Sequence, residues 1–198
     1  MEEKLIQPVQ AADHALSLCK IFNEVRVSTT REMYMISRWQ APTHGFLKLN
    51  VDGAIFADLR RAGVGVVLRD MCGVIVMVAS KHEEDVDGAE TIESIAVLRG
   101  LQLCLPLGIP KLILECDCMN VVRELQSTEA SMASAGNVIN DAKMLMGRFQ
   151  EVRVQHVNRI GNGVAHSLAR HAWNIVDINV WWEQIPSFIR NALWFDTN

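Results

Sequence analysis

Partway along the chain the spacing of the apolar residues changes from that of strands to that of a helix. This first change constrains the fold more than any other feature. Over residues 46–79, polar and apolar residues alternate or form short apolar runs separated by turns, which predicts three consecutive strands. Over residues 89–105, apolar residues recur at helical spacing, and prolines at 106 and 110 end the helix. Because the loops between the three strands are short, we expect an antiparallel meander followed by a helix.

Alternating strands and helices follow this first helix. We expect further strands at residues 111–116 and 152–156, and helices that begin near residues 121, 138 and 164. The resulting order is β-β-β-α-β-α-α-β-α. It predicts an α/β fold with a mixed five-stranded sheet, made of an antiparallel meander plus parallel strands, with helices packed on it.

The sequence divides into three parts. Residues 1–38 form an N-terminal appendage, in which the apolar residues between 11 and 22 have helical spacing. Residues 39–185 form the α/β domain, and residues 186–198 form a C-terminal tail. The region from residue 174 onward is rich in tryptophan, and we expect it to pack back on the domain. A chain of 198 residues suits one domain with modest extensions.

Composition excludes several classes of protein. With 49% hydrophobic and 21% charged residues, the chain is not intrinsically disordered. No apolar run approaches the ~18 residues of a membrane span, and the N-terminus lacks a secretory pattern, so we expect a cytoplasmic or nuclear protein without a membrane partner. Five cysteines without C-x-x-C spacing argue against a disulfide framework or zinc finger, and Cys116 and Cys118 are expected to be core thiols. A net charge of −4 does not favour a strongly basic nucleic-acid binder.

Three acidic residues are placed where predicted elements begin or end. Asp52 lies on the polar side of the first strand, Glu93 in the first turns of the long helix, and Asp117 directly after the strand at 111–116. They are 41 and 24 residues apart, so only the fold can bring them together. Each acid taken alone is also explained as a solvated side chain or a helix cap.

Four motifs occur in a fixed order along the chain. They are KLNVDGA with GVGVVLRD at residues 48–54 and 63–70, ESIAVLRGL at 93–101, LECDC at 114–118, and HVNRIGNGVAHSLA at 156–169. This order resembles a type 1 RNase H domain, and most closely the plant reverse-transcriptase-like branch, which is often derived from retroelements. The resemblance covers residues 39–185. Glu90 competes with Glu93 for the second acid, but Leu101 follows Glu93 by eight residues, as the family helix requires.

The resemblance implies a fold, an activity and a cofactor. It implies a ribonuclease that cleaves the RNA strand of RNA–DNA hybrids endonucleolytically. Two Mg²⁺ ions, for which Mn²⁺ can substitute, would be held by Asp52, Glu93 and Asp117, since carboxylates are the hard oxygen ligands that Mg²⁺ prefers. In such a site one metal helps to activate a water and the other stabilises the leaving 3′-oxygen.

Two histidines complete the candidate catalytic set. His166 stands where the active enzymes of the family carry a fourth acid. Because imidazole is a poor Mg²⁺ ligand, we expect weaker binding of one metal and reduced activity, or else a His166 that hydrogen-bonds within the site without touching metal. His156 precedes Asn162 by six residues, as does a proton-shuttling histidine in cellular RNases H. The alternative is a histidine that ends an apolar strand and bonds to a loop.

Nucleic-acid contacts are the less defined part of the prediction. The residues expected to contact nucleic acid, chiefly its phosphates, are Lys48, Arg60, Arg61 and Asn162. Cellular RNases H often carry a basic helical protrusion, but residues 126–141 of this chain have only acids among their ionisable side chains. We therefore expect a weak grip on a hybrid, or dependence on a partner.

Three functions remain open on sequence alone. The first, which we favour, is the metal-dependent ribonuclease. The second is a catalytically impaired module of the same fold that binds nucleic acid. The third is a domain that acts through protein partners, using residues 1–38 or the tryptophan-rich C-terminal region.

Overall fold

The computed structural model describes residues 38–56, 61–183 and 185–197. Contacts divide the chain into two units, Met1–Arg38 and Trp39–Asn198. The helix predicted between residues 11 and 22 lies outside the described residues. Among the described residues, no helix has both the length and the apolar character that a membrane crossing requires.

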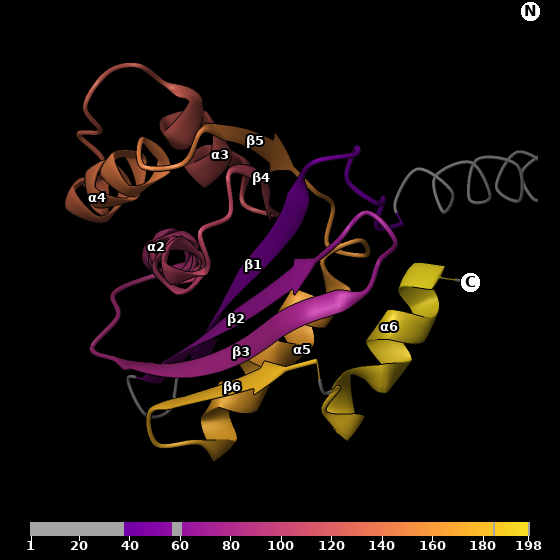
Figure 1. Cartoon of the computed structure of the whole chain (residues 1–198). Coiled ribbons are helices and arrows are strands. Elements are labelled where there is room, and N and C mark those ends of the chain that lie inside the picture. The colour runs from indigo at the N-terminus through magenta and orange to yellow at the C-terminus, as the bar shows by residue number, and fades with distance from the viewer. Residues whose placement is uncertain (1–37, 57–60, 184, 198) are drawn as a thin grey trace, which may run out of the picture. The chain divides into compact units, whose positions relative to one another are not determined.

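Strands β1 (Leu47–Phe56), β2 (Arg61–Arg69) and β3 (Ile75–Glu84) form the predicted antiparallel meander (Figure 1). Asp52 of β1 lies opposite Gly65 of β2. β3 extends beyond residue 79, where the predicted strands end, because residues 81–84 continue the pairing with β2. Their polarity is typical of loops, but strand preference depends on neighbouring strands more than on the residues themselves.

The α/β half of the domain follows the predicted order. Its elements are α2 (Ala89–Cys104), the short helix η2 (Leu105–Leu107), β4 (Lys111–Cys116), α3 (Met119–Gln126), α4 (Gly136–Met146), β5 (Glu151–His156), α5 (Gly163–His171) and the short helix η3 (Ala172–Asn174). β4 pairs in parallel with both β1 and β5. The mixed sheet of the sequence prediction is therefore confirmed.

The sheet has six strands rather than the predicted five. β6 (Ile178–Trp182) pairs antiparallel with β3, and the strand order is β5-β4-β1-β2-β3-β6. The short helix η4 (Ser187–Ile189) and α6 (Arg190–Thr197) follow it. Residues 186–198, expected as a C-terminal tail that packs back on the domain, belong to the same compact unit as the sheet. A strand of five residues at a sheet edge is defined by its partner, so its own sequence gives little warning of it.

Helices cover both faces of the sheet (Figure 1). α2 packs on β1 and β2 from one side, and α5 packs on the same two strands from the other. Leu49 and Val51 face α2, since a Cβ atom on Gly100 of that helix would meet both side chains. Because successive strand side chains alternate, Asn50 and Asp52 face α5. β1 thus has an apolar face toward α2 and a polar face toward α5.

A buried polar network fills part of the α5 face. Arg69 at the end of β2 is 2% exposed and pairs with Asp196 of α6. Its guanidinium also donates to Asn50 Oδ1 at 3.2 Å and lies 3.8 Å from the centroid of the Trp39 ring. Trp39 Nε1 donates to the same Asn50 oxygen at 2.9 Å. The buried charge of Arg69 is compensated by its partner Asp196. Together these contacts hold α6 and the chain around Trp39 against the sheet.

Two glycines let the helices approach the sheet closely. A Cβ atom on Gly53 would lie 2.8 Å from the backbone carbon of Ile92 in α2, and one on Gly65 would overlap the carbonyl oxygen of Ala165 in α5. These contacts place the first turn of α2 beside β1 and the first turns of α5 beside β2. The close approach therefore sets where Glu93 and His166 lie relative to Asp52.

Replacing Gly65 with Ala tests this close approach. We expect Gly65→Ala to lower the free energy of unfolding by about 1–3 kcal/mol, because the added methyl group forces α5 away from β2. Urea unfolding measures the effect. Gly163→Ala is the matched control, because a Cβ atom there meets nothing within 4 Å. A Gly65→Ala protein as stable as the control would show that α5 can move outward freely.

Candidate active site

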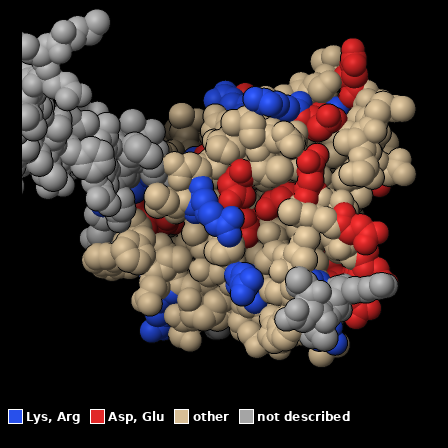
Figure 2. Space-filling view, turned by 180° about the vertical axis from the view of Figure 1, so that it is seen from behind, with Lys and Arg blue, Asp and Glu red and all other residues tan. Residues whose placement is uncertain are grey.

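The three predicted acids meet at one end of the β1–β4 pair. Val51 of β1 lies opposite Cys116 of β4, so Asp52 and Asp117 follow paired positions on parallel neighbours. The carboxyl groups of Asp52 and Asp117 lie close enough for the charge of Asp52 to raise the pKa of Asp117. Glu93 joins them because Gly53 holds α2 against β1. Figure 2 shows acidic side chains gathered in the middle of one face of the molecule, with basic side chains beside them.

Burial and neighbouring acids raise the pKa of Glu93 and of Asp117. Burial, followed by the charges of Asp52 and Asp117, raises the pKa of Glu93 from an ordinary 4.5 to about 8. Burial and the charge of Asp52 also raise the pKa of Asp117, while the Arg159 guanidinium opposes this rise. Such crowding of carboxylates favours a cation that would restore their charge. The donor set therefore fits a divalent metal.

This electrostatic arrangement predicts a pH-dependent stability in metal-free protein. The unfolded chain loses the Glu93 proton near pH 4.5 and the folded chain only near pH 8, so unfolding releases a proton between these values and stability falls as the pH rises. We expect a fall of about 2–4 kcal/mol across this window, measured by urea unfolding in a chelator. Glu93→Gln should remove most of the fall, and Glu90→Gln on the same helix is the control. An identical fall in both variants would place the titration elsewhere.

Glu93, rather than its competitor Glu90, points into this cluster. The Glu93 carboxyl lies 3.7 Å from the Sγ atom of Cys116. The Glu90 carboxyl instead accepts a hydrogen bond from Asn120 at 3.2 Å. Helical spacing decides the difference, because residues three apart differ in direction by about 60° around a helix. The choice of Glu93 made from Leu101 agrees with this geometry.

Cys116 is buried, as expected of a core thiol, but it also borders the acids. Its Sγ atom contacts Glu93 and accepts a hydrogen bond from the backbone N–H of Cys118 at 3.4 Å. Burial raises the pKa of the Cys116 thiol, and the charge of Glu93 raises it further. Sequence reasoning missed this contact. A signal was available, because Cys116 alternates with Leu112 and Leu114 and so faces α2, the helix that carries Glu93.

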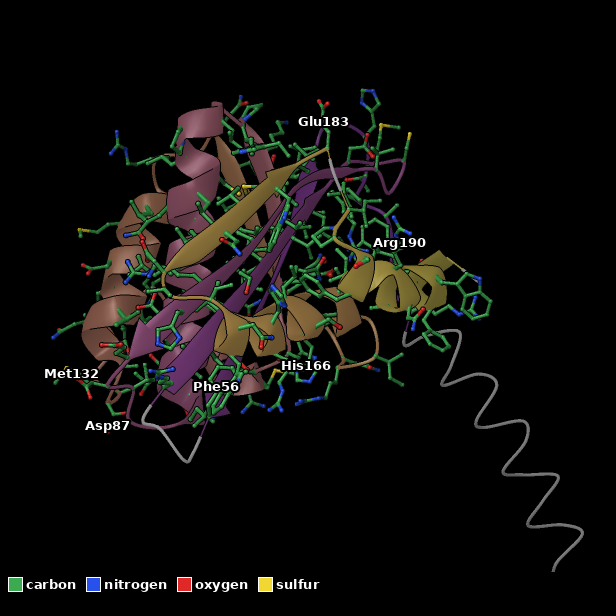
Figure 3. All side chains as sticks on the ribbon, turned by 90° about the horizontal axis from the view of Figure 1, so that it is seen from below. Phe56, Asp87, Met132, His166, Glu183 and Arg190 are labelled. Atoms are coloured by element: carbon green, nitrogen blue, oxygen red, sulfur yellow. The ribbon has the colours of Figure 1, made fainter. Side chains whose placement is uncertain are left out.

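His166 hydrogen-bonds within the site. Its Nδ1 atom lies 2.9 Å from Asp52 Oδ2, and its Nε2 atom lies 3.3 Å from a guanidinium nitrogen of Arg159. Figure 3 shows His166 on the α5 side of the sheet. The same guanidinium nitrogen is 3.4 Å from Nδ1, so it contacts both ring nitrogens and does not assign the proton. A carboxylate only accepts, so in the bond to Asp52 the Nδ1–H group of His166 is the donor. This is a hydrogen bond within the site, as the second interpretation of His166 expects, and the relation of His166 to a metal stays a prediction.

His156 lies at the end of β5, beside the third acid. Its Nε2 atom is 3.2 Å from the backbone oxygen of Asp117, and the side chain is exposed. This is the loop contact of the alternative interpretation. The exposed ring also remains beside the acids, so the role as a proton shuttle stays a prediction.

The structure corrects two of the predicted nucleic-acid contacts. Lys48 is 3% exposed, and its ammonium group pairs with Glu115 of β4. Asn162 is also buried, and its side chain donates to the carbonyl oxygen of Val51 at 2.8 Å. Both side chains are buried and bonded within the domain, so neither is accessible to a phosphate in this structure. Arg61 is exposed at the start of β2, and Arg60 lies outside the described residues.

Comparison with known proteins agrees with this fold. The reverse transcriptase-like family profile matches residues 50–172. RNase H1 from Halobacterium salinarum superimposes with a TM-score of 0.60 and 23% identity, covering 65% of this chain and 98% of its own. The N-terminal RNase H domain of Rv2228c from Mycobacterium tuberculosis, solved as a fusion with maltose-binding protein, gives 0.59 and 18%, covering 65% and 94%.

A third solved structure is LC11-RNase H1, obtained from compost by a metagenomic approach and crystallised with an RNA/DNA hybrid. In that complex it gives a TM-score of 0.58 and 18% identity, covering 65% of this chain and 96% of its own. The curated proteins yield no match. The predicted plant and retroelement origin stays a prediction. The chain belongs to the reverse transcriptase-like family, and its domain has the RNase H fold.

Proposed function

We propose that this protein is a ribonuclease that cleaves the RNA strand of RNA–DNA hybrids endonucleolytically with the help of divalent metal ions. One observation carries the proposal. Asp52, Glu93 and Asp117 come from three separate elements and converge in a poorly solvated place, where burial, and then the charges of neighbouring acids, raise the pKa values of Glu93 and Asp117. A fold that keeps three acids in mutual repulsion loses stability, which is typical of a functional site.

The carboxylates of Asp52, Glu93 and Asp117 would hold the metal ions, with Mg²⁺ favoured by their hard oxygen atoms and Mn²⁺ able to substitute. When bound, such ions supply activation of water and stabilisation of the leaving 3′-oxygen. The protein's own part is to hold the acids in place. His166 does this for Asp52, because a donated hydrogen bond fixes one of its two oxygens.

Arg159 and His156 supply the remaining chemistry of the proposed site. The Arg159 guanidinium lies between His166 and the charge of Asp117, where it can donate to a phosphate oxygen of the substrate. His156 is exposed beside Asp117 and can carry a proton between solvent and the reacting oxygens. We include Arg61 as a contact to the nucleic-acid backbone.

The alternative proposal is a module that binds nucleic acid without cutting it. His166 favours this proposal. It stands where the active enzymes of the family carry a fourth acid, and it is hydrogen-bonded to one oxygen of Asp52. A protein partner is a further element of this proposal. Trp182 and Trp194 are 49% and 59% exposed, so part of the tryptophan-rich region presents apolar surface outward.

A cleavage assay separates these proposals. We expect an end-labelled RNA–DNA hybrid to be cut in its RNA strand, faster in Mn²⁺ than in Mg²⁺, and not at all in a chelator. Mn²⁺ should be the better cofactor because Mg²⁺ demands near-ideal octahedral coordination by oxygen atoms, and this site lacks the fourth carboxylate. Binding of the hybrid without cutting in either metal would reject the ribonuclease and leave the binding module. Cutting that persists in the chelator would reject the metal-dependent mechanism.

A further inference from the structure

Three ligand atoms of two chemical kinds converge beside α2. One atom each from Glu93, Cys116 and Asp117, two carboxylate oxygens and one thiol sulfur, all lie within 4.8 Å of one another. Carboxylates alone suit Mg²⁺, but a sulfur donor suits softer cations such as Zn²⁺ and Cd²⁺. Cys116 therefore changes which cations the cluster can bind.

The separation of the sulfur from the oxygen fits a shared ion. Zn²⁺ lies about 2.3 Å from a thiolate sulfur and about 2.1 Å from a carboxylate oxygen, so tetrahedral geometry places these two ligand atoms about 3.6 Å apart. Cys116 Sγ and Glu93 Oε2 are 3.7 Å apart. A cation can bind between them without movement of either backbone, by replacing the S–H···O contact.

The three residues also leave such an ion a path of entry. Cys116 is fully buried and forms the floor of the cluster, whereas Glu93 and Asp117 are partly exposed. A cation can therefore meet the carboxylates first and the sulfur last. Asp52 is not counted among the ligands of this ion, because one of its oxygens is already hydrogen-bonded to His166.

We propose that Glu93, Cys116 and Asp117 form a site for a thiophilic divalent cation of the Zn²⁺ class, with water as a fourth ligand. On binding, the metal–sulfur bond replaces the S–H bond of Cys116, and the proton passes to solvent. Because Glu93 and Asp117 are also the proposed Mg²⁺ ligands, Zn²⁺ and Mg²⁺ compete for the cluster. The competition, and the inhibition that follows from it, rests on the proposed function; the binding itself does not.

Cd²⁺ is the probe for this site, because a cadmium–thiolate bond gives an ultraviolet charge-transfer band that carboxylates do not. The full chain, freed of metal with a chelator, is titrated with Cd²⁺ as wild type, Cys116→Ser and Cys104→Ser. Cys104 is the matched control, since it is equally buried in the same core and burial alone raises its pKa. Subtracting the Cys116→Ser spectrum from the wild-type spectrum removes the contribution of the other cysteines.

We expect the band in the wild type and in Cys104→Ser, and its loss in Cys116→Ser. Glu93→Gln keeps every thiol and should need about 10–100-fold more Cd²⁺ for the same band, which tests the site even if Cys116→Ser folds poorly. Excess Mg²⁺ should raise the Cd²⁺ requirement of the wild type. Equal bands in wild type and Cys116→Ser, or a Glu93→Gln titration that matches wild type, overturn the proposal. A band that depends on Cys116 in a protein that cuts no RNA supports the site and rejects only the proposed function.

Discussion

Asp52→Asn should lower the rate of RNA cleavage by at least about a thousandfold in both Mg²⁺ and Mn²⁺. Asp52 is 1% exposed and lies between His166 and Asp117, so its charge acts at short range in a poorly solvated place. Asparagine has nearly the same shape and keeps an oxygen that accepts the His166 proton. The substitution therefore removes a metal ligand and a charge while the fold is retained, which circular dichroism can check.

A second pair of variants controls for a general effect of losing an acid. Glu93→Gln should be nearly as inactive as Asp52→Asn, while Glu90→Gln, three residues earlier on the same helix, should stay within about threefold of wild type. The structure separates the two, because Glu93 lies beside Cys116 and Glu90 bonds to Asn120. If Glu90→Gln and Glu93→Gln lost equal activity, the acids assigned to the site would be wrong.

His166→Asp should raise Mg²⁺-supported cleavage by about 10–100-fold and lower the Mg²⁺ concentration needed for half the maximal rate. The substitution adds an oxygen ligand and a negative charge where the family's active enzymes carry an acid. It also frees the Asp52 oxygen that His166 now holds at 2.9 Å. The measurement is the initial rate as a function of Mg²⁺ and of Mn²⁺, and the advantage of Mn²⁺ should shrink.

His166→Asn separates the two parts of this effect. It removes the imidazole from Asp52 but adds no charge. We expect it to gain little, because the missing carboxylate is what limits metal binding. A His166→Asn protein as active in Mg²⁺ as His166→Asp would show instead that the hydrogen bond to Asp52 is what holds the activity down.

The sequence predicts those parts of the molecule that depend on local pattern. Alternation along β1 separates Leu49 and Val51 from Asp52, in agreement with the structure. The choice of Glu93 over Glu90 comes from the family resemblance rather than from local pattern, and the structure places Glu93 beside Cys116. The order of elements predicts a mixed sheet, but the pairing of β4 with β1, which brings together acids from β1, α2 and the end of β4, is given by the structure.

Features that depend on register between distant strands could not be predicted. Lys48 resembles a surface cation until Glu115, 67 residues later, is known to lie next to it. β6 has five residues and becomes a strand only through β3. The Arg69–Asp196 pair joins residues 127 apart. In each case the decisive partner comes from the assembled sheet, and no local pattern contains it.

The same long separations bear on how quickly the protein folds. Asp52 and His166 are 114 residues apart, and β4 pairs with β1 although β2, β3 and α2 lie between them in the sequence. Closing loops of this length costs entropy before any contact compensates for it, so chains with such distant pairings reach the native state slowly. We expect folding on the order of milliseconds or slower rather than microseconds. The acids of the site then stay apart, and repel one another little, until the sheet that brings them together has formed.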